Sequence, residues 1–340
     1  MTSFRGKAIL ANRDIIDDIW VPKQMANSYD PDINPQGIIN LCVAENKLCE
    51  DIICAKINEC MPKQTDADWL YYASHPYGTI SFRQAVCGVI NEFFKPRTPV
   101  TAEQKSHFED SGSYGASQIE KYYLKAVSEG FTVRGLVIIN PDNPSGKIYS
   151  SEEITDILRV CEKYGLHAIV DEIYALTRYG YEPFTSILSI PNLPNIDRTH
   201  FMWGLSKDFC MNGYRCEWIR EIFLPTNRKR LQKSYKTVTK FLDDLNIPHY
   251  KGQAGFYVWA DFSKFLRSTA SDDEFEFFKE CAEEGVLVNP GTRFFTSERG
   301  CVRLVFTVPY NHLIESLKRI KVVCERRNKE KTTTEVIFKA

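Results

Sequence analysis

Three short and mostly apolar runs in the middle of the chain predict buried strands. The runs cover residues 135–139, 167–170 and 201–203, and each is flanked by polar or turn-forming residues. Runs of this length without polar alternation are typical of strands that are covered on both faces of a parallel sheet. We therefore predict that these segments belong to one parallel sheet.

The segment between the first two strands has the pattern of an amphipathic crossover helix. Its apolar positions recur every three or four residues, at Ile154, Ile157, Leu158 and Cys161. Ser150 and Glu153 have the spacing of a capping box at the start of this helix, and Gly165 is placed to end it. A strand, a helix and a strand in this order predict an α/β fold.

The pattern changes in the last third of the chain. Amphipathic helices are predicted within residues 231–245, 275–281 and 313–324, and strands at 256–259 and 302–306. This mixture predicts a second, smaller α+β domain. The predicted boundaries are 1–70 for an N-terminal arm and part of the small domain, 71–227 for an abbreviated large domain, 228–328 for the C-terminal small domain and 329–340 for a tail.

Composition places the chain among globular, cytosolic proteins. Hydrophobic residues make up 43% of its 340 residues, which is enough for a substantial core. The formal net charge of −1 does not favour nucleic acid or a membrane surface as a partner. The 11 cysteines form no CxxC pair, so we expect no metal site and no regular disulfide framework. We expect no signal peptide or membrane span, and the predicted location is the cytoplasm.

Three polar segments follow the predicted strands and carry the candidate chemistry. The segment 204–209 reads Gly-Leu-Ser-Lys-Asp-Phe, with Lys207 near its centre and Arg215 eight residues beyond the lysine. A lysine amine with a lowered pKa can form a Schiff base with a carbonyl group. An arginine nearby can lower that pKa, and it can also hold a phosphate group through two parallel hydrogen bonds.

The second polar segment, Asp171-Glu172-Ile173-Tyr174, directly follows the run 167–170. An apolar strand followed by Asp-Glu is also typical of a Walker B strand, whose carboxylate holds Mg²⁺ in ATPases. That function needs an upstream phosphate-binding loop of the form GxxxxGK[ST]. The candidate Gly146-Lys147 pair is followed by Ile148 and has Pro141 in place of the first glycine. We therefore reject the ATPase interpretation.

The third polar segment, residues 140–146, reads Asn-Pro-Asp-Asn-Pro-Ser-Gly and follows the first strand. Two Asn-Pro pairs in one turn are more specific than a generic loop. In this order the three segments resemble the cofactor-binding signature of the class I/II aminotransferases, which are fold-type I pyridoxal-phosphate enzymes. The segment 39–48, with its Ala-Glu-Asn triplet, and the run 255–259 resemble the 1-aminocyclopropane-1-carboxylate synthase-like group of that family.

The resemblance covers residues 37–321 in collinear blocks. It implies an α/β fold with a fold-type I architecture, in which an abbreviated central parallel-sheet domain is joined to a smaller α+β domain. It also implies pyridoxal 5'-phosphate as the cofactor, an amino acid as the small-molecule substrate, and a homodimer. Neither nucleic acid nor a membrane is implied as a partner.

The resemblance assigns roles to individual residues. Lys207 would form the Schiff base, and the Asp171 carboxylate would hold the protonated pyridine nitrogen. The other cofactor-binding residues would be Asn143 and Tyr174 at the ring oxygen, with Tyr174 also counted as catalytic, and Ser206 and Arg215 at the phosphate.

The resemblance also places residues at the substrate. Arg303, in a predicted C-terminal strand, would clamp the substrate α-carboxylate. Glu45 and Tyr77 would be further substrate-binding residues. Tyr77 lies one position later than the tyrosine of the family, which reaches the cofactor of the partner subunit.

Two blocks of the family have no counterpart in this chain. The first block, expected between Phe93 and Asn140, carries a Gly-Ala or Gly-Thr turn that holds the phosphate at a helix N-terminus, and an aromatic residue that stacks on the pyridine ring. The segment Gly115-Ala116-Ser117 is similar to this turn, but it lies only 27 residues before Asn143, so we predict a loop there. The second gap follows Arg215. In addition, Gly204 stands where the family has a hydroxyl residue that binds the phosphate.

These observations predict a pyridoxal-phosphate-dependent enzyme that acts on an amino acid, with transamination through a lysine Schiff base as the favoured reaction. One alternative is a lyase of the 1-aminocyclopropane-1-carboxylate synthase type that acts on S-adenosylmethionine. Another is a truncated, non-catalytic relative that acts through dimerisation. Because each lost charge-assisted hydrogen bond costs about 1.5–3 kcal/mol, the missing phosphate turn predicts weak cofactor binding and low activity.

Overall fold

The chain forms two compact units. The computed structural model describes residues 16–60, 80–99, 115–208, 219–267, 271–294, 296 and 298–339. One unit, which we call the sheet unit, comprises residues 46–233 and 251–256. The other, which we call the terminal unit, comprises residues 1–45, 234–250 and 257–340.

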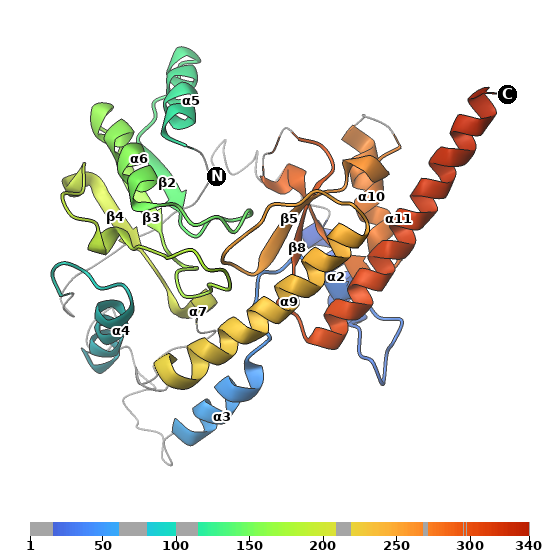
Figure 1. Ribbon diagram of the computed structural model, residues 1–340, viewed down its shortest axis with the longest axis horizontal. Coiled ribbons are helices and arrows are strands. Elements are labelled where there is room, and N and C mark those ends of the chain that lie inside the picture. Colours follow the sequence, from blue (N-terminus) through green and yellow to red (C-terminus); the bar gives the residue numbers. More distant parts are fainter. Residues whose placement is uncertain are drawn as a thin grey trace, which may run out of the picture. The chain divides into compact units, whose positions relative to one another are not determined.

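A three-stranded parallel sheet forms the centre of the sheet unit (Figure 1). Its strands are β2 (Gly135–Ile139), β3 (His167–Asp171) and β4 (Thr199–Met202), and they lie side by side in that order. Both neighbouring pairs run parallel, as the three apolar runs predict. The structure therefore confirms the α/β architecture of this region.

The helices and short helical turns of the sheet unit precede, connect or follow these three strands along the sequence. They are α3 (Glu50–Cys60), α4 (Ile80–Phe93), α5 (Ala116–Ser128), α6 (Ser151–Lys163), η3 (Ile187–Ser189), η4 (Ile196–Arg198), α7 (Leu205–Asp208) and η5 (Ile219–Phe223). Helix α9 (Leu224–Asp244) begins in the sheet unit and ends in the terminal unit.

Helix α6 is the predicted crossover helix between β2 and β3. The Ser150 hydroxyl accepts a hydrogen bond from the Glu153 amide at 3.1 Å, and the Glu153 carboxylate accepts one from the Ser150 amide at 2.8 Å. This reciprocal pair satisfies two backbone donors that the first turn would otherwise leave without a partner. Gly165 adopts a φ of 64°, a conformation that favours glycine and ends the helix.

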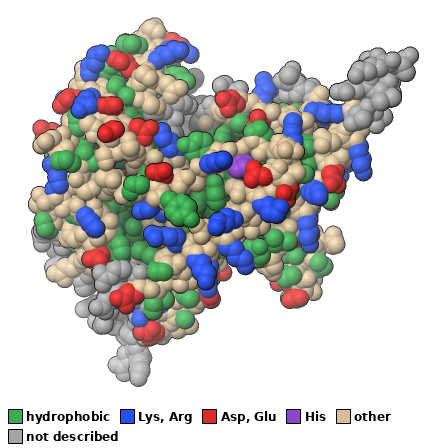
Figure 2. Space-filling model, viewed as in Figure 1, with side chains coloured by type: hydrophobic (Ala, Val, Ile, Leu, Met, Phe, Trp, Pro, Cys, Tyr) green, Lys and Arg blue, Asp and Glu red, His purple; other side chains and the backbone are tan. Residues whose placement is uncertain are grey.

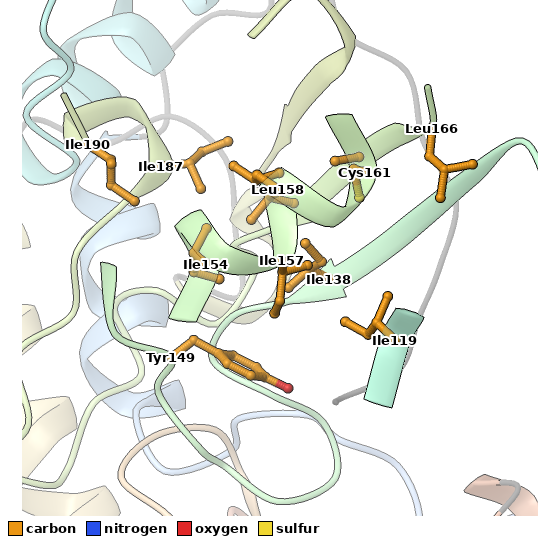
Figure 3. Close-up of a cluster of buried hydrophobic side chains, with 12 residues drawn as sticks. Ile119, Ile138, Tyr149, Ile154, Ile157, Leu158, Cys161, Leu166, Ile187 and Ile190 are labelled. Atoms are coloured by element: carbon orange, nitrogen blue, oxygen red, sulfur yellow. The ribbon is translucent and has the colours of Figure 1, made fainter. Parts of the chain in front are cut away.

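The buried face of α6 packs against the sheet and α5 in one apolar core. Ile154, Ile157, Leu158 and Cys161 are all at most 1% exposed. Figure 3 shows them beside Ile138 of β2 and Ile119 of α5. Burying a side chain of this size contributes about 1.5–3 kcal/mol, so this face holds the helix on the sheet.

The start of α5 corrects one prediction. Gly115, Ala116 and Ser117 were expected to form a loop, but Gly115 is the N-cap of α5 and the helix begins at Ala116. The Gly115 carbonyl accepts hydrogen bonds from the amides of Gln118 and Ile119, both at 3.0 Å. The apolar Ile119 is buried in the core, so packing favours the helix where local composition favours a loop.

The terminal unit contains two small sheets. Strands β5 (Tyr257–Asp261), β8 (Cys301–Val305) and β7 (Asn289–Pro290) form an antiparallel sheet in that order. Strands β1 (Ile39–Asn40) and β6 (Val286–Leu287) form a short parallel pair. The segment 39–40, far away in the sequence, therefore becomes part of the same unit as the C-terminal strands.

The helices of the terminal unit include the longest one described. The unit contains η1 (Ile16–Trp20), α2 (Val21–Ala26), η6 (Ser263–Phe265), α10 (Ser271–Glu283), η7 (Gly291–Phe294) and α11 (Tyr310–Lys339). Helix α11 includes residues 329–339, which the sequence assigns to a tail. Every helix in the described residues is too short or too polar to cross a lipid bilayer. Basic and acidic side chains are interspersed over the visible surface in Figure 2.

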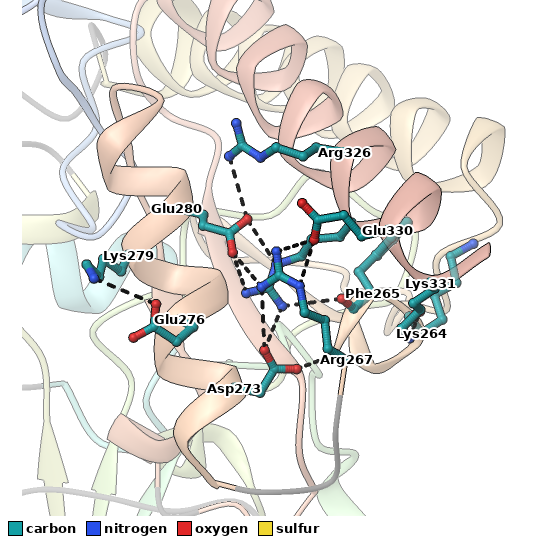
Figure 4. Close-up of polar contacts among 11 residues, drawn as sticks. Lys264, Phe265, Arg267, Asp273, Glu276, Lys279, Glu280, Arg326, Glu330 and Lys331 are labelled. Atoms are coloured by element: carbon teal, nitrogen blue, oxygen red, sulfur yellow. Dashed lines mark hydrogen bonds and ion pairs between the residues drawn. The ribbon is translucent and has the colours of Figure 1, made fainter. Parts of the chain in front are cut away.

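A buried arginine ties α11 to α10. The Arg327 side chain is fully buried and donates hydrogen bonds to Asp273 at 3.1 Å and to Glu280 at 2.9 Å. Arg267 donates to Glu280 at 2.7 Å and to Glu330 of α11 (Figure 4). Burial alone would raise the pKa of Glu280, but the hydrogen bonds from Arg327 and Arg267 outweigh it and lower the pKa.

Replacing Arg327 by Met should destabilise the terminal unit. The change keeps most of the side-chain volume but leaves Asp273 and Glu280 without their buried partner, at a cost of about 3–5 kcal/mol. The free energy of unfolding, measured by denaturant titration, tests this. The matched control is Arg326→Met, which removes an exposed arginine that pairs with Glu280 and Glu284 at 3.6 and 3.4 Å and should cost at most about 1 kcal/mol. Equal losses in the two variants would contradict the expectation.

Candidate active site

The three polar segments leave the sheet at the same edge. Ile139, the last residue of β2, pairs with Asp171 at the end of β3, and Asp171 pairs with Met202 at the end of β4. The segments that follow these strands therefore start side by side. The carboxyl edge of a parallel α/β sheet is where such folds bind their ligands.

Backbone hydrogen bonds continue beyond the ladder and hold these starting points together. The Asn140 amide donates to the Asp171 carbonyl at 2.8 Å, and the Glu172 amide donates to the Met202 carbonyl at 2.8 Å. Asp171 itself is 5% exposed, and its carboxylate accepts a hydrogen bond from the Ile173 amide at 3.0 Å. The structure thus places a buried carboxylate at the centre of this edge.

Tyr174 lies on a tight turn directly after Asp171. It is 4% exposed, and its ring meets that of Phe256 edge-on with the centroids 5.6 Å apart. The Thr177 hydroxyl donates to the Tyr174 carbonyl at 2.7 Å and accepts from the Gly255 amide at 2.9 Å. The turn is therefore held from two sides, which limits where the tyrosine ring can lie.

Asn143 lies on the turn that follows β2. Two cis peptide bonds, Asn140–Pro141 and Asn143–Pro144, shape this turn, and the Asp142 carboxylate accepts hydrogen bonds from the Ser145 amide at 3.2 Å and from the Ser145 hydroxyl. Asn143 is half-buried. Gly146 ends the turn, and its carbonyl accepts a hydrogen bond from the Gln253 amide at 2.8 Å.

Gly146 is required here for two independent reasons. Its φ of 72° is one that residues with a side chain rarely adopt. A Cβ atom at this position would lie 2.5 Å from the Ala254 carbonyl oxygen. The close approach of the segment 251–256 to the turn therefore depends on the missing side chain.

Lys207 and Ser206 lie on the single helical turn α7, which follows β4. Lys207 is half-buried and Ser206 is exposed. The next residue, Asp208, is fully buried, although no function was predicted for it. Its carboxylate accepts hydrogen bonds from the Trp203 indole nitrogen at 2.6 Å and from the Leu176 amide at 3.1 Å.

Three carboxylates are buried close to each other in this region. Burial raises the pKa of Glu172 to about 8, and the charges of Asp171 and Asp208 add to the shift, against opposing hydrogen bonds from Ser186 and Ile187. Burial and the charge of Asp171 also raise the pKa of Asp208 well above its usual range, against the hydrogen bonds from Trp203 and Leu176. Sequence reasoning missed Glu172 and Asp208, and their only signal was a charged residue next to a predicted site residue.

The predicted site residues fall into three groups. Asn143, Asp171, Tyr174, Ser206 and Lys207 belong to segments that the structure brings to one edge of the sheet. Arg303 and Glu45 belong to the terminal unit. Tyr77 and Arg215 lie outside the described residues.

Arg303 lies in the middle of the antiparallel sheet of the terminal unit. It pairs with Trp259 of β5 and Asn289 of β7, and it is 7% exposed. Its guanidinium donates to the Cys42 carbonyl at 2.6 Å and lies over the Phe294 ring, 4.8 Å from the centroid. A guanidinium held between a carbonyl and a ring has a restricted orientation, and this type of group can bind a carboxylate.

The segment 41–45 lies beside the same strand. The Val305 amide donates to the Leu41 carbonyl at 3.1 Å, and the Thr307 hydroxyl donates to the Glu45 carbonyl at 2.5 Å. The Glu45 side chain is exposed. Arg303 and Glu45, predicted together but distant in the sequence, thus lie in the same unit, where residues at and just after the end of β8 hold the segment 41–45.

The donors and acceptors at the sheet edge suit the ring of pyridoxal phosphate. A buried carboxylate can hold the protonated pyridine nitrogen, a tyrosine hydroxyl and an asparagine amide can reach a ring oxygen, and a lysine amine can react with an aldehyde. For the phosphate the described residues offer the Ser206 hydroxyl, on a helical turn. The described residues hold no group of three or more His, Cys, Asp or Glu side chains that could bind a metal.

Comparison with known protein families gives a match to the model of aminotransferase class I and II, over residues 97–220 and 217–320. Among curated proteins, "Probable inactive 1-aminocyclopropane-1-carboxylate synthase-like protein 2" of Mus musculus is 28% identical, over 90% of this chain and 69% of its own. The human 1-aminocyclopropane-1-carboxylate synthase-like protein 1 is 27% identical, over 94% of this chain and 83% of its own.

The alignment with the mouse protein also bears on the missing blocks. It spans 404 positions, more than the 340 residues of this chain. The relative therefore carries residues that have no counterpart here, as expected if segments of the family are absent from this chain.

Solved structures show the same fold at low sequence identity. The aromatic aminotransferase from Pyrococcus horikoshii OT3 superposes with a TM-score of 0.64 at 16% identity, covering 91% of this chain and 99% of its own. The aspartate aminotransferase from Thermus thermophilus with maleate also gives 0.64 at 16% identity, covering 95% of this chain and 100% of its own. The fold is that of the fold-type I aminotransferases.

The stability of the sheet unit should depend on the ionisation of Glu172. Its pKa is about 8 in the folded chain against 4.5 as the ordinary value, so the folded state holds a proton that the unfolded state releases. Between these two pH values the free energy of unfolding should fall as pH rises, by up to about 1.4 kcal/mol per pH unit.

Glu172→Gln, which cannot ionise, should remove this dependence. The difference in unfolding free energy between wild type and variant should shift in favour of the variant from about pH 5 to about pH 8, as measured by denaturant titration. Asp208 is present in both proteins, so the difference between them reports chiefly the ionisation of Glu172. A difference that stays constant over this range would show that Glu172 is charged in the folded state.

Proposed function

This chain belongs to the aminotransferase class I and II family, whose members depend on pyridoxal phosphate, and on that premise we propose that it binds this cofactor and acts on an amino acid by transamination. The observation that carries the proposal is the alignment of three strand ends. Because these strand ends are aligned, the segments that carry Asn143, Asp171 and Lys207 begin side by side at the carboxyl edge of the parallel sheet.

Each residue has a distinct task in this proposal. When bound, the cofactor supplies an electron sink for the bonds at the substrate α-carbon. The Asp171 carboxylate keeps a proton on the pyridine nitrogen, and its burial strengthens that interaction because little water competes. The Lys207 amine would hold the cofactor and would move the proton of the substrate α-carbon.

The remaining residues orient the cofactor and the substrate. Asn143 and Tyr174 bind the ring oxygen, and Ser206 and Arg215 bind the phosphate. Arg303 clamps the substrate carboxylate, with Glu45 and Tyr77 near the substrate. Burial of Arg303 supports its role, since a desolvated guanidinium binds a carboxylate more strongly than an exposed one does.

Two further functions remain candidates because specific observations favour them. A lyase acting on S-adenosylmethionine is favoured by the Ala44-Glu45-Asn46 triplet and by relatives named as 1-aminocyclopropane-1-carboxylate synthase-like. A non-catalytic relative is favoured by the mouse protein with "inactive" in its name and by the residues that this chain lacks relative to it. We propose weak cofactor binding, a homodimer and a cytoplasmic location.

Lys207 should be the residue that forms a covalent bond with pyridoxal phosphate. Borohydride reduction of the protein with added cofactor, followed by peptide mapping, should find the pyridoxyl group on Lys207, and Lys207→Ala should abolish the label. Lys56→Ala, which removes a lysine with 13% side-chain exposure from α3, is the matched control and should leave the label in place. Labelling of another lysine, or of none, would overturn the assignment.

Arg303→Lys should raise KM for an amino-acid substrate by about 10-fold or more and leave the cofactor absorbance unchanged. Lysine keeps the charge but cannot present two parallel donors, and losing such a pair costs about 1.5–3 kcal/mol. Steady-state kinetics tests this. The control is Arg293→Lys, which alters a half-buried arginine that donates to Asn289 at 2.8 Å in the same unit. If both variants keep the wild-type KM, Arg303 does not bind the substrate.

A further inference from the structure

Asp208 connects the turn that carries Lys207 to the segment that follows Tyr174. Its carboxylate is fully buried at the end of α7. One oxygen accepts a hydrogen bond from the Trp203 indole nitrogen at 2.6 Å, and the other accepts from the Leu176 amide at 3.1 Å. The two donors come from different segments, one before the lysine and one after Tyr174.

Both donors are themselves held in place by packing. The Trp203 ring meets Phe94 edge-on, with the ring centroids 5.1 Å apart. Leu176 and Trp203 belong to the same apolar cluster, together with Phe223 and Leu224. Trp203 is partly buried, and an indole packed against another ring and an apolar cluster cannot easily change its orientation, so its N–H points at a defined place.

Helix α7 alone cannot keep Lys207 in a fixed position. It contains four residues, Leu205–Asp208, and an isolated helix of a single turn is unstable because nucleation is unfavourable. The hydrogen bond from the Leu176 amide to the Asp208 carboxylate connects this turn to the turn carrying Tyr174. Lys207 is the residue immediately before Asp208, so its backbone position follows from the same contacts.

We propose that Asp208 is a positioning residue, which fixes the Lys207 backbone relative to the turn of Asp171 and Tyr174. The proposal rests on the proposed function, in which Lys207 is the residue that reacts. In that function Lys207 and Asp171 would both hold the cofactor, so the position of one relative to the other would matter. A displacement of about 1 Å in such an arrangement can cost as much as 100-fold in rate.

The charges around Asp208 are compatible with this role. Burial and the nearby charge of Asp171 disfavour the ionised form of Asp208. The N–H groups of Trp203 and Leu176 favour that form. In either ionisation state an aspartate side chain offers an oxygen to each of these two donors. Asparagine cannot do so, because its NH₂ group would face one of the N–H donors.

The test separates cofactor binding from covalent bond formation. Asp208→Asn should slow the attachment of pyridoxal phosphate to Lys207 by at least about 10-fold, measured by borohydride quenching over time, while the Kd of the non-covalent complex changes less. Trp203→Phe, which removes one donor and keeps an aromatic ring, should slow attachment to a smaller extent. The double variant should be no slower than Asp208→Asn alone, because without the Trp203 donor the asparagine oxygen can accept from the Leu176 amide while its NH₂ group meets no N–H donor.

A matched control shows whether any buried carboxylate would give the same effect. Glu172 is as deeply buried as Asp208 and accepts from the Ile187 amide at 2.7 Å, so it fastens a different segment. Glu172→Gln should leave the attachment rate within about 2-fold of wild type. An equal loss in Glu172→Gln and Asp208→Asn, or wild-type attachment in Asp208→Asn, would overturn the proposal.

A measurement without the cofactor distinguishes failure of this proposal from failure of the proposed function. In the cofactor-free protein, Trp203→Phe and Asp208→Asn should increase hydrogen exchange at the Leu176 amide. They should also change the rate of Lys207 acylation, which is measured by mass spectrometry. Glu172→Gln should change neither the exchange nor the acylation rate. If wild type never attaches the cofactor at Lys207, the proposed function fails, and this measurement still decides the role of Asp208. If the exchange and acylation of Lys207 are unchanged in both variants, the positioning role is wrong.

Discussion

The parallel hydrogen-bond ladder between β2, β3 and β4 is the constraint on which the candidate site depends. Because Ile139, Asp171 and Met202 occupy neighbouring positions in the register, three segments that are distant in the sequence begin side by side. A shift of one residue in any strand would turn its side chains to the opposite face. The apolar core beneath α6 holds this register, so the packing of Ile157 and Leu158 also governs the chemistry at the sheet edge.

The same edge concentrates groups that oppose folding. Asp171, Glu172 and Asp208 are all at most 5% exposed, and they repel each other when ionised. Such groups are retained in proteins when backbone and side-chain donors hold them, as the amides of Ile173, Ile187 and Leu176 do here. Local stability is therefore reduced at this edge of the sheet, as is common at functional sites.

The terminal unit follows a different principle. Its organising groups are arginines rather than carboxylates: Arg303 is held between the Cys42 carbonyl and the Phe294 ring, and Arg327 is held between Asp273 and Glu280. The first donates to a backbone carbonyl, and a buried guanidinium is a group that suits a carboxylate, which fits a binding role. The second has both acidic partners within 3.1 Å and serves the packing of α11 on α10.

The sequence alone determined the strands, the crossover helix and the nature of the candidate residues. Apolar runs and the Ser150–Glu153 capping box are local signals. Strands β2 and β3 and helix α6 follow them closely, whereas β4 begins two residues before the predicted run 201–203 and ends at Met202. The motifs around Asn143, Asp171 and Lys207 were also readable, because their order and residue types are specific. The assignment of Gly115-Ala116-Ser117 to a loop was wrong, because the burial of Ile119 against the core stabilises a helix there.

Only the tertiary structure decided which residues share an environment. It aligned the three strand ends, buried Asp208 against Trp203 and Leu176, and raised the pKa of Glu172 to about 8. It also joined the segment 39–45 to β6 and β8, more than 200 residues away in the chain. No local sequence pattern indicates these features, because burial and electrostatic coupling depend on which distant segments pack together. The sequence gives the residues but not their neighbours in space.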